Sequence, residues 1–221
     1  MPRIPGRSCR GTKMRRLLQR IKYTPYVTIG LMVINFVVFL LTEIGGSSES
    51  TWHMYRWGAM LTSSISEDGE YWRMFTAMFL HFGFEHLASN LLVLFALGTV
   101  LEKGIGHLRL ALIYLVSGVG ANAITFLWHY RMDEEVLSAG ASGAIFGLMG
   151  AMIFAGLFAR EWIGALSLGQ VILMLILSLY HGVNEAVSDI AHLSGLFVGF
   201  LTAILLLKVF PGQYLYDRRR W

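Results

Sequence analysis

A single hydroxyl group stands among small residues in the stretch Gly140-Ala141-Ser142-Gly143, at the start of an apolar run. We expect Ser142 to begin a helix, where free backbone N–H groups and the positive end of the helix dipole can stabilise a developing oxyanion. Small residues four apart, here Gly143 and Gly147, more often serve only the close packing of membrane helices. A chemical role for Ser142 therefore depends on which other side chains come near it.

Two other apolar segments carry polar side chains that would complement the serine. One begins with His86 and Asn90, which are four residues apart and so share a helix face. The other carries His192, with Gly195 and Gly199 on the same face at spacings of three and seven. This bare stripe would let the segment press against another helix and bring His192 with it. Polar side chains inside membrane helices are costly, so each is a candidate for function.

The rise of a helix places these side chains in one layer. Counted at about 1.5 Å per residue from the far end of each expected span, Ser142 lies at about 27 Å, His192 and His86 at about 24 Å and Asn90 at about 18 Å. Agreement among three separate spans favours a common site over scattered polar contacts between helices. A transporter or channel would instead spread such residues through the full depth.

A serine, a histidine and further donors at one depth fit acyl transfer. Ser142 would be the nucleophile, because His192 could take its proton and later protonate the leaving amine. The side chains of His86 and Asn90 and the Ser142 N–H would hold the oxyanion. Asp189, three residues before His192, could complete a triad, but an acid at this position more often caps or precedes a helix.

Hydropathy decides which elements carry these residues. The chain has 221 residues, of which 55% are hydrophobic and only 14% charged, and its mean hydropathy is +0.57. Soluble domains average about 25% charged residues, so the composition predicts an all-α polytopic membrane protein with one domain. The single cysteine, Cys9, excludes an intramolecular disulfide. At about 20 residues per span, six spans are expected, near residues 26–41, 83–101, 108–128, 142–159, 162–180 and 190–210.

Positive charge gathers in every second connecting segment. All Lys and Arg except Arg56, Arg73 and Arg131 lie in residues 1–24, 102–109, 160–161 and 208–221. Since positive charge marks cytoplasmic loops, both termini are predicted in the cytoplasm and the Ser142 layer toward the outer face. We expect a basic tail over 1–24, a six-helix domain over 25–210 and a basic tail over 211–221. The first tail is expected to rest on the anionic inner leaflet, and nothing supports nucleic-acid binding.

The first outer loop, about residues 42–82, is long for a compact domain. It is dense in aromatic residues, which is typical of segments at the membrane interface: Trp52, Tyr55, Trp57, Tyr71 and Trp72. We therefore expect this loop to be folded and partly embedded.

These residues, in this order and on these spans, resemble the rhomboid family of intramembrane serine proteases over essentially the whole six-span core. The resemblance rests on Gly140-x-Ser142-Gly143, His86-xxx-Asn90 and Ala191-His192-xx-Gly195-xxx-Gly199. Further matches are Trp72-Arg73 in the first loop, His81 five residues before His86, and Glu102 at the inner end of the second span.

The resemblance implies a Ser142–His192 dyad without a third acid. It also implies an oxyanion hole formed by His86, Asn90 and the Ser142 amide, a water-filled cavity that opens outward, no metal and no other cofactor. The residues that would pack the site are Gly140, Gly143, Phe146, Gly195 and Gly199. Phe146 stands where many relatives have tyrosine, and its ring would lie on His192. Trp72, Arg73, His81 and Glu102 are expected to be structural, and His53, His107, His129 and His181 to be solvated.

The function expected from the resemblance is hydrolysis of peptide bonds in or next to transmembrane segments of single-span membrane proteins. Substrates would enter near the fifth span, beneath a cap of about residues 181–189. The alternative is a catalytically silent rhomboid-like protein that binds client membrane helices; such relatives typically lack the serine or the histidine that this chain keeps. We expect a bacterial plasma-membrane protein whose site opens to the extracytoplasmic side. The sequence does not indicate an oligomeric state.

Overall fold

The computed structural model of the protein describes residues 24–158 and 189–209. The apolar helices within these ranges are α2 (Tyr26–Gly45), α6 (Gly83–Ile105), α7 (His107–Arg131), α8 (Ser142–Phe158) and α10 (Asp189–Ala203), which continues as the π-helical segment η3 (Ile204–Val209). Among the described helices, four are long and apolar enough to cross a membrane, and α8 is a shorter apolar helix. The predicted all-α fold is confirmed. The expected fifth span at 162–180, both basic tails and the cap at 181–189 lie almost entirely outside the described residues.

Two helices extend beyond the spans expected from hydropathy. α2 continues to Gly45 instead of ending near residue 41, and α6 continues to Ile105 instead of residue 101. Every residue of the segment 102–109 except Gly106 is therefore helical, because α7 already begins at His107. Gly106 has a φ of +90°, a conformation that glycine adopts easily, so the chain can reverse here within one residue.

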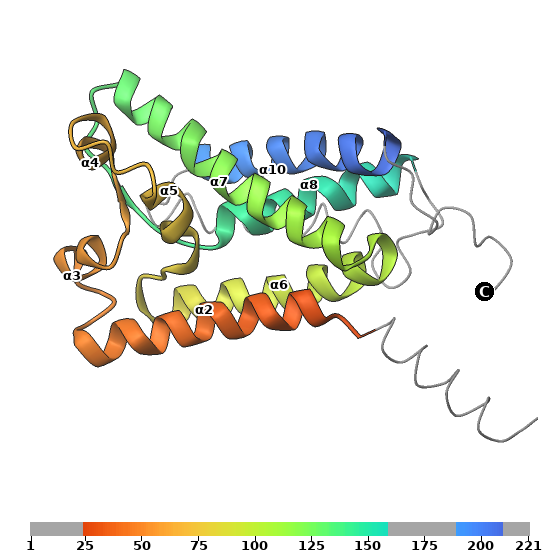
Figure 1. The fold of residues 1–221 in the computed structure, drawn as a ribbon, viewed down its shortest axis with the longest axis horizontal. Helices are drawn as coiled ribbons and strands as arrows, with labels where there is room; N and C mark the ends of the chain where they lie inside the picture. Colours follow the sequence, from red (N-terminus) through yellow and green to blue (C-terminus); the bar gives the residue numbers. More distant parts are fainter. Residues whose placement is uncertain (1–23, 159–188, 210–221) are drawn as a thin grey trace, which may run out of the picture.

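The helix that starts at Ser142 forms the centre of the bundle. Figure 1 shows α2 and α6 side by side along one edge and α8 beside α10, with α7 crossing the bundle obliquely. Almost every side chain of α8 is buried, because its sequence is apolar on all faces and carries no charge. Its 17 described residues span about 26 Å.

Glycine allows α8 and α10 to pack backbone against backbone. A Cβ added to Gly195 would collide with the Gly143 carbonyl oxygen, and a Cβ added to Gly199 would collide with that of Gly147. From the other side, a Cβ on Gly150 would collide with the Leu196 carbonyl oxygen. Such close contact between membrane helices requires small residues at the crossing.

The long loop after α2 is folded, as predicted. It contains α3 (Thr51–Arg56), β1 (Met60–Leu61), α4 (Thr62–Ser66), α5 (Arg73–Thr76) and the 3-10 turn η1 (Ala77–Phe79). β1 pairs antiparallel with β2 (Leu137–Ser138), with Met60 opposite Ser138 and Leu61 opposite Leu137. The sequence did not predict this pair, because two-residue strands are too short to show an alternating pattern.

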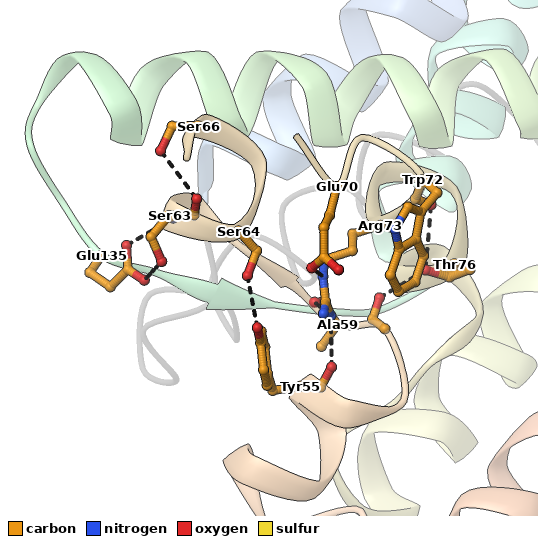
Figure 2. A network of polar contacts seen from close by, with 11 residues as sticks. Tyr55, Ala59, Ser63, Ser64, Ser66, Glu70, Trp72, Arg73, Thr76 and Glu135 are labelled. Carbon is orange, nitrogen blue, oxygen red and sulfur yellow. Dashed lines mark hydrogen bonds and ion pairs between the residues drawn. The ribbon is translucent and has the colours of Figure 1, made fainter. Parts of the chain in front are cut away.

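A buried arginine holds this loop together (Figure 2). The Arg73 guanidinium donates to the carbonyl oxygens of Tyr55 at 2.7 Å and Ala59 at 2.9 Å, and to the Glu70 carboxylate at 2.5 Å. It also lies 4.3 Å from the centroid of the Tyr55 ring and 4.6 Å from that of Trp72. The charge is thus paired and hydrogen-bonded, which is what makes a buried cation tolerable.

At the opposite end of α6, Glu102 joins three helices. Its carboxylate accepts hydrogen bonds from the backbone N–H groups of Val27 at 2.8 Å and Thr28 at 2.7 Å, and from the Thr28 hydroxyl at 2.5 Å. These are the first N–H groups of α2, which have no partner within their own helix. Nδ1 of His107, the first residue of α7, bonds the same carboxylate.

Three of the histidines that were expected to be solvated also make specific side-chain contacts. Besides His107, the His53 ring bonds the Thr42 carbonyl oxygen at 2.9 Å, and the His129 ring bonds Glu134 at 2.7 Å. The acceptor is a backbone carbonyl oxygen near the end of α2 for His53, and a carboxylate for His107 and His129. His181 lies outside the described residues.

Candidate active site

Ser142 is the first residue of α8, and β2 leads into it through residues 139–141. Gly140 has a φ of +147°, and a Cβ added there would lie 2.9 Å from the His86 ring and 3.6 Å from the Ser142 hydroxyl oxygen. The His86 ring, in the first turn of α6, and the Ser142 hydroxyl therefore approach each other across this glycine. A larger residue at position 140 would be strained and would displace the ring.

His192 comes to the same region from the first turn of α10. It is 5% exposed, and its ring lies flat on Phe146, with 4.2 Å between ring centroids and 2° between ring planes. Phe146 is four residues beyond Ser142 on α8, so the stacking holds the imidazole beside the helix face that carries the serine. Neither ring nitrogen of His192 has a hydrogen-bond partner among the described residues. Buried polar atoms are normally paired, so this ring calls for a functional explanation.

The two polar residues of α6 differ in their present contacts. The half-buried ring of His86 meets the His81 ring edge to face, with centroids 5.2 Å apart. The buried side chain of Asn90 donates from Nδ2 to the carbonyl oxygen of His86 in its own helix, at 2.9 Å. The amide of Asn90 has a second N–H bond, so this contact uses half of its donor capacity.

Asp189 is the exposed first residue of α10, a position where a carboxylate interacts favourably with the helix dipole. Within the described part of the chain, no group of three or more His, Cys, Asp or Glu side chains could hold a metal ion.

Comparison with known proteins gives the family. The model of the rhomboid domain matches residues 68–209, a segment that contains the Ser142, His192, His86 and Asn90 region described above. The chain belongs to the rhomboid family. It is accordingly an integral membrane protein.

Individual rhomboid relatives resemble the chain over different shares of their length. It is 36% identical over 185 residues to "Rhomboid protease GluP" of Bacillus subtilis (strain 168), covering 82% of this chain and 35% of that protein. It is 34% identical over 168 residues to "RHOMBOID-like protein 1" of Arabidopsis thaliana, covering 74% of this chain and 41% of that protein. With "Putative rhomboid protease YdcA" of Bacillus subtilis (strain 168) it shares 33% identity over 195 residues, or 88% of this chain and 94% of that protein. The chain thus spans well under half of the first two relatives and nearly all of the third.

In this rhomboid structure α7 also packs closely against the first turns of α8, a contact that the sequence did not predict. A Cβ on Gly143 would lie 2.8 Å from the Ala121 side chain, and a Cβ on Gly147 would collide with Ser117. The Ser117 hydroxyl is itself bonded to the Ile113 carbonyl oxygen of α7 at 2.5 Å. The sequence feature that could have predicted this contact is the pair of small residues four apart on α7, which resembles the glycine pairs of α8 and α10.

The rhomboid structure brings the His86 and His192 rings to the helix that Ser142 begins. His86 lies against Gly140 beside the serine, and His192 lies on Phe146 one turn along the same helix. Asn90 bonds only its own helix among the described residues. The arrangement offers a hydroxyl, an imidazole without a partner among the described residues, a second imidazole and the N–H groups of a helix start. Chemically, this set can transfer a proton from an oxygen nucleophile and stabilise a developing negative charge.

Proposed function

We propose that this rhomboid protein is an intramembrane serine endopeptidase that uses Ser142 as nucleophile and His192 as general base and acid. The observation that supports the proposal most directly is the buried His192 ring, which is stacked on the helix that Ser142 begins and whose two nitrogens have no partner among the residues that the structure describes. A histidine that served only packing would gain from a hydrogen-bond partner, whereas a catalytic base must keep a nitrogen for the substrate reaction. In apo structures such catalytic contacts are often loose and tighten only on binding.

The proposed reaction is acyl transfer in two steps. Ser142 Oγ attacks the carbonyl carbon of the scissile peptide bond while His192 accepts the hydroxyl proton. Collapse of the tetrahedral intermediate breaks the C–N bond, and the protonated His192 gives its proton to the departing amine. Water then attacks the acyl-serine ester by the same route, which regenerates the Ser142 hydroxyl and releases the new carboxyl end.

The negative charge of the tetrahedral intermediate would be held by the Ser142 N–H at the start of α8 and by the side chains of His86 and Asn90. The His86 ring already lies against Gly140, next to the serine. The first turn of α8 adds unpaired N–H groups and the positive end of the helix dipole. For Asn90, the second N–H of its amide would serve, since the first bonds its own helix.

The proposed substrates are single-span membrane proteins, cut in or next to their transmembrane segments. The peptide must be unwound at the cut, because the carbonyl groups of a helix are hydrogen-bonded and shielded. An α8 that begins below the membrane surface would bring Ser142 to such segments, provided that water reaches it from outside. We place the protease domain at residues 25–210 between two basic cytoplasmic tails, in a bacterial plasma membrane, with the site open to the extracytoplasmic side.

The test is cleavage of a model transmembrane substrate by the purified protein in detergent. Ser142→Ala and His192→Ala are each expected to lower the cleavage rate by about 10⁴-fold or more, because nucleophile and base act as a unit. Ser66→Ala, in α4, and His129→Ala, in the last turn of α7, are controls because neither residue belongs to the proposed site, and both should cut at the wild-type rate.

The outcomes separate the protease from its alternative. Cleavage by the Ser142 and His192 variants at the control rate would refute the dyad. If the wild type does not cut, and a fluorophosphonate that reacts with activated serines leaves Ser142 unlabelled, the chain is a silent rhomboid-like protein that binds client helices.

A further inference from the structure

A short segment before α6 holds the backbone that leads into Ser142. The carbonyl oxygen of Ala77, in η1, accepts a hydrogen bond from the Gly140 N–H at 2.9 Å. Four residues later, Nε2 of His81 accepts a hydrogen bond from the Ala141 N–H at 3.4 Å. One segment therefore binds two consecutive N–H groups, and the next N–H along the chain belongs to Ser142.

His81 is in a state that suits a hydrogen-bond acceptor. Its side chain is fully buried, at 0% exposure. Burial and the neighbouring His86 lower the pKa of His81 to about 3, against a smaller opposing contribution from the Phe79 backbone. The ring is therefore uncharged at neutral pH, and because Nε2 accepts, the ring proton must be on Nδ1.

His81 also touches the second element of the site. Its ring meets the His86 ring edge to face, with centroids 5.2 Å and planes 71° apart. Edge-to-face packing limits how far the His86 ring can turn. His81 thus contacts both the segment that orients the Ser142 N–H and the ring that lies beside the Ser142 hydroxyl.

We propose that His81 is a positioning residue: its neutral ring fixes the Ala141 N–H and the His86 ring, and so sets the geometry of the oxyanion hole. This inference rests on the proposed protease function. It differs from a purely structural role, in which His81 would only hold the first outer loop. That loop has its own anchors, since Arg73 bonds Tyr55 and Ala59, and His53 bonds the end of α2.

Two substitutions of nearly equal size isolate the acceptor. His81→Gln keeps an oxygen acceptor near the position of Nε2, whereas His81→Met has a similar length and only a weak thioether acceptor. The measurement is the rate at which a fluorophosphonate labels Ser142, per folded molecule and at saturating probe. We expect His81→Met to lower this rate by between about tenfold and a hundredfold, as displacements of catalytic groups by about 1 Å do. His81→Gln should recover most of the loss.

A control substitution addresses the loop itself. His53 lies in the same loop, and His53→Met removes a ring nitrogen that bonds the Thr42 carbonyl oxygen near the end of α2, away from residues 140–142. It should lower the unfolding temperature and leave the labelling rate of the folded protein unchanged. Equal labelling rates for His81→Gln and His81→Met would overturn the proposal, whatever their unfolding temperatures.

A measurement on the wild type separates this inference from the proposed function. The ¹⁵N chemical shifts of His81 at neutral pH distinguish a ring protonated on Nδ1 from one protonated on Nε2. We expect the Nδ1–H form, which leaves Nε2 as acceptor, and an Nε2–H form would overturn the proposal even if neither His81 variant folds. If Ser142 of the wild type is not labelled at all, the protease function fails, while the tautomer still decides whether His81 holds Ala141.

Discussion

The Glu102 carboxylate at one end of the bundle is fully hydrogen-bonded, whereas the buried His192 ring at the Ser142 end has no hydrogen-bond partner among the described residues. The Glu102 carboxylate accepts bonds from Val27, Thr28 and His107. At the Ser142 end, neither ring nitrogen of His192 has a partner among the described residues. A buried group without a partner costs about 1–3 kcal/mol, so stability alone would not favour this arrangement. We infer that the Glu102 end anchors the helices, whereas the Ser142 end keeps groups for a reaction.

The strongest effect on stability is expected from removing the anchor. Glu102→Ala leaves the buried N–H groups at the start of α2 without an acceptor, and should lower the free energy of unfolding by about 3 kcal/mol. Thermal unfolding in detergent measures this loss. Glu102→Gln keeps one carbonyl acceptor and should lose less. Because Glu102 lies 16 residues, or about 24 Å, along α6 from His86, the folded fraction of either variant should label Ser142 at the wild-type rate. A lower rate per folded molecule would contradict the division between the two ends.

A smaller loss of stability, but a larger loss of activity, is expected from separating α8 and α10. Gly195→Ala places a methyl group against the Gly143 carbonyl oxygen, and overpacking of this kind costs about 1–3 kcal/mol. The shift also moves His192, which precedes Gly195 by one turn, away from the serine helix, so cleavage should fall by about 10²-fold. Gly30→Ala on α2 is the matched control, since a Cβ there meets nothing within 4 Å. Equal activity of the two variants would show that the close helix contact does not set the His192 position.

The sequence predicted which polar residues share a helix face better than it predicted the hydrogen bonds that join one element to another. Helical spacing grouped His86 with Asn90 and His192 with Gly195, because a fixed rise and turn per residue determine which side chains share a face. The long apolar runs predicted most of the described helices, because a helix needs about 20 mainly apolar residues to cross a membrane. The hydrogen bonds of His81 and Glu102 were not predictable from spacing, because each joins elements whose approach depends on the whole packing. The small residues of α7 were visible in the sequence, but spacing alone does not say which helix they face.

The β1–β2 pair gives the smallest predicted effect and the finest test of where the anchor ends and the site begins. Beside this pair, the Glu135 carboxylate accepts bonds from the Ser63 hydroxyl at 2.5 Å and the Ser63 N–H at 3.1 Å (Figure 2). Ser63→Ala removes one of these exposed contacts and should lower the free energy of unfolding by less than about 1 kcal/mol. Ser66→Ala, on the same short helix, is the control because its hydroxyl bonds only within α4. Glu135 lies five residues before Gly140, so a looser strand could still shift the entry to Ser142. If Ser63→Ala slows labelling of Ser142 while Ser66→Ala does not, the strand pair belongs with the site, and an unchanged rate assigns it to the scaffold.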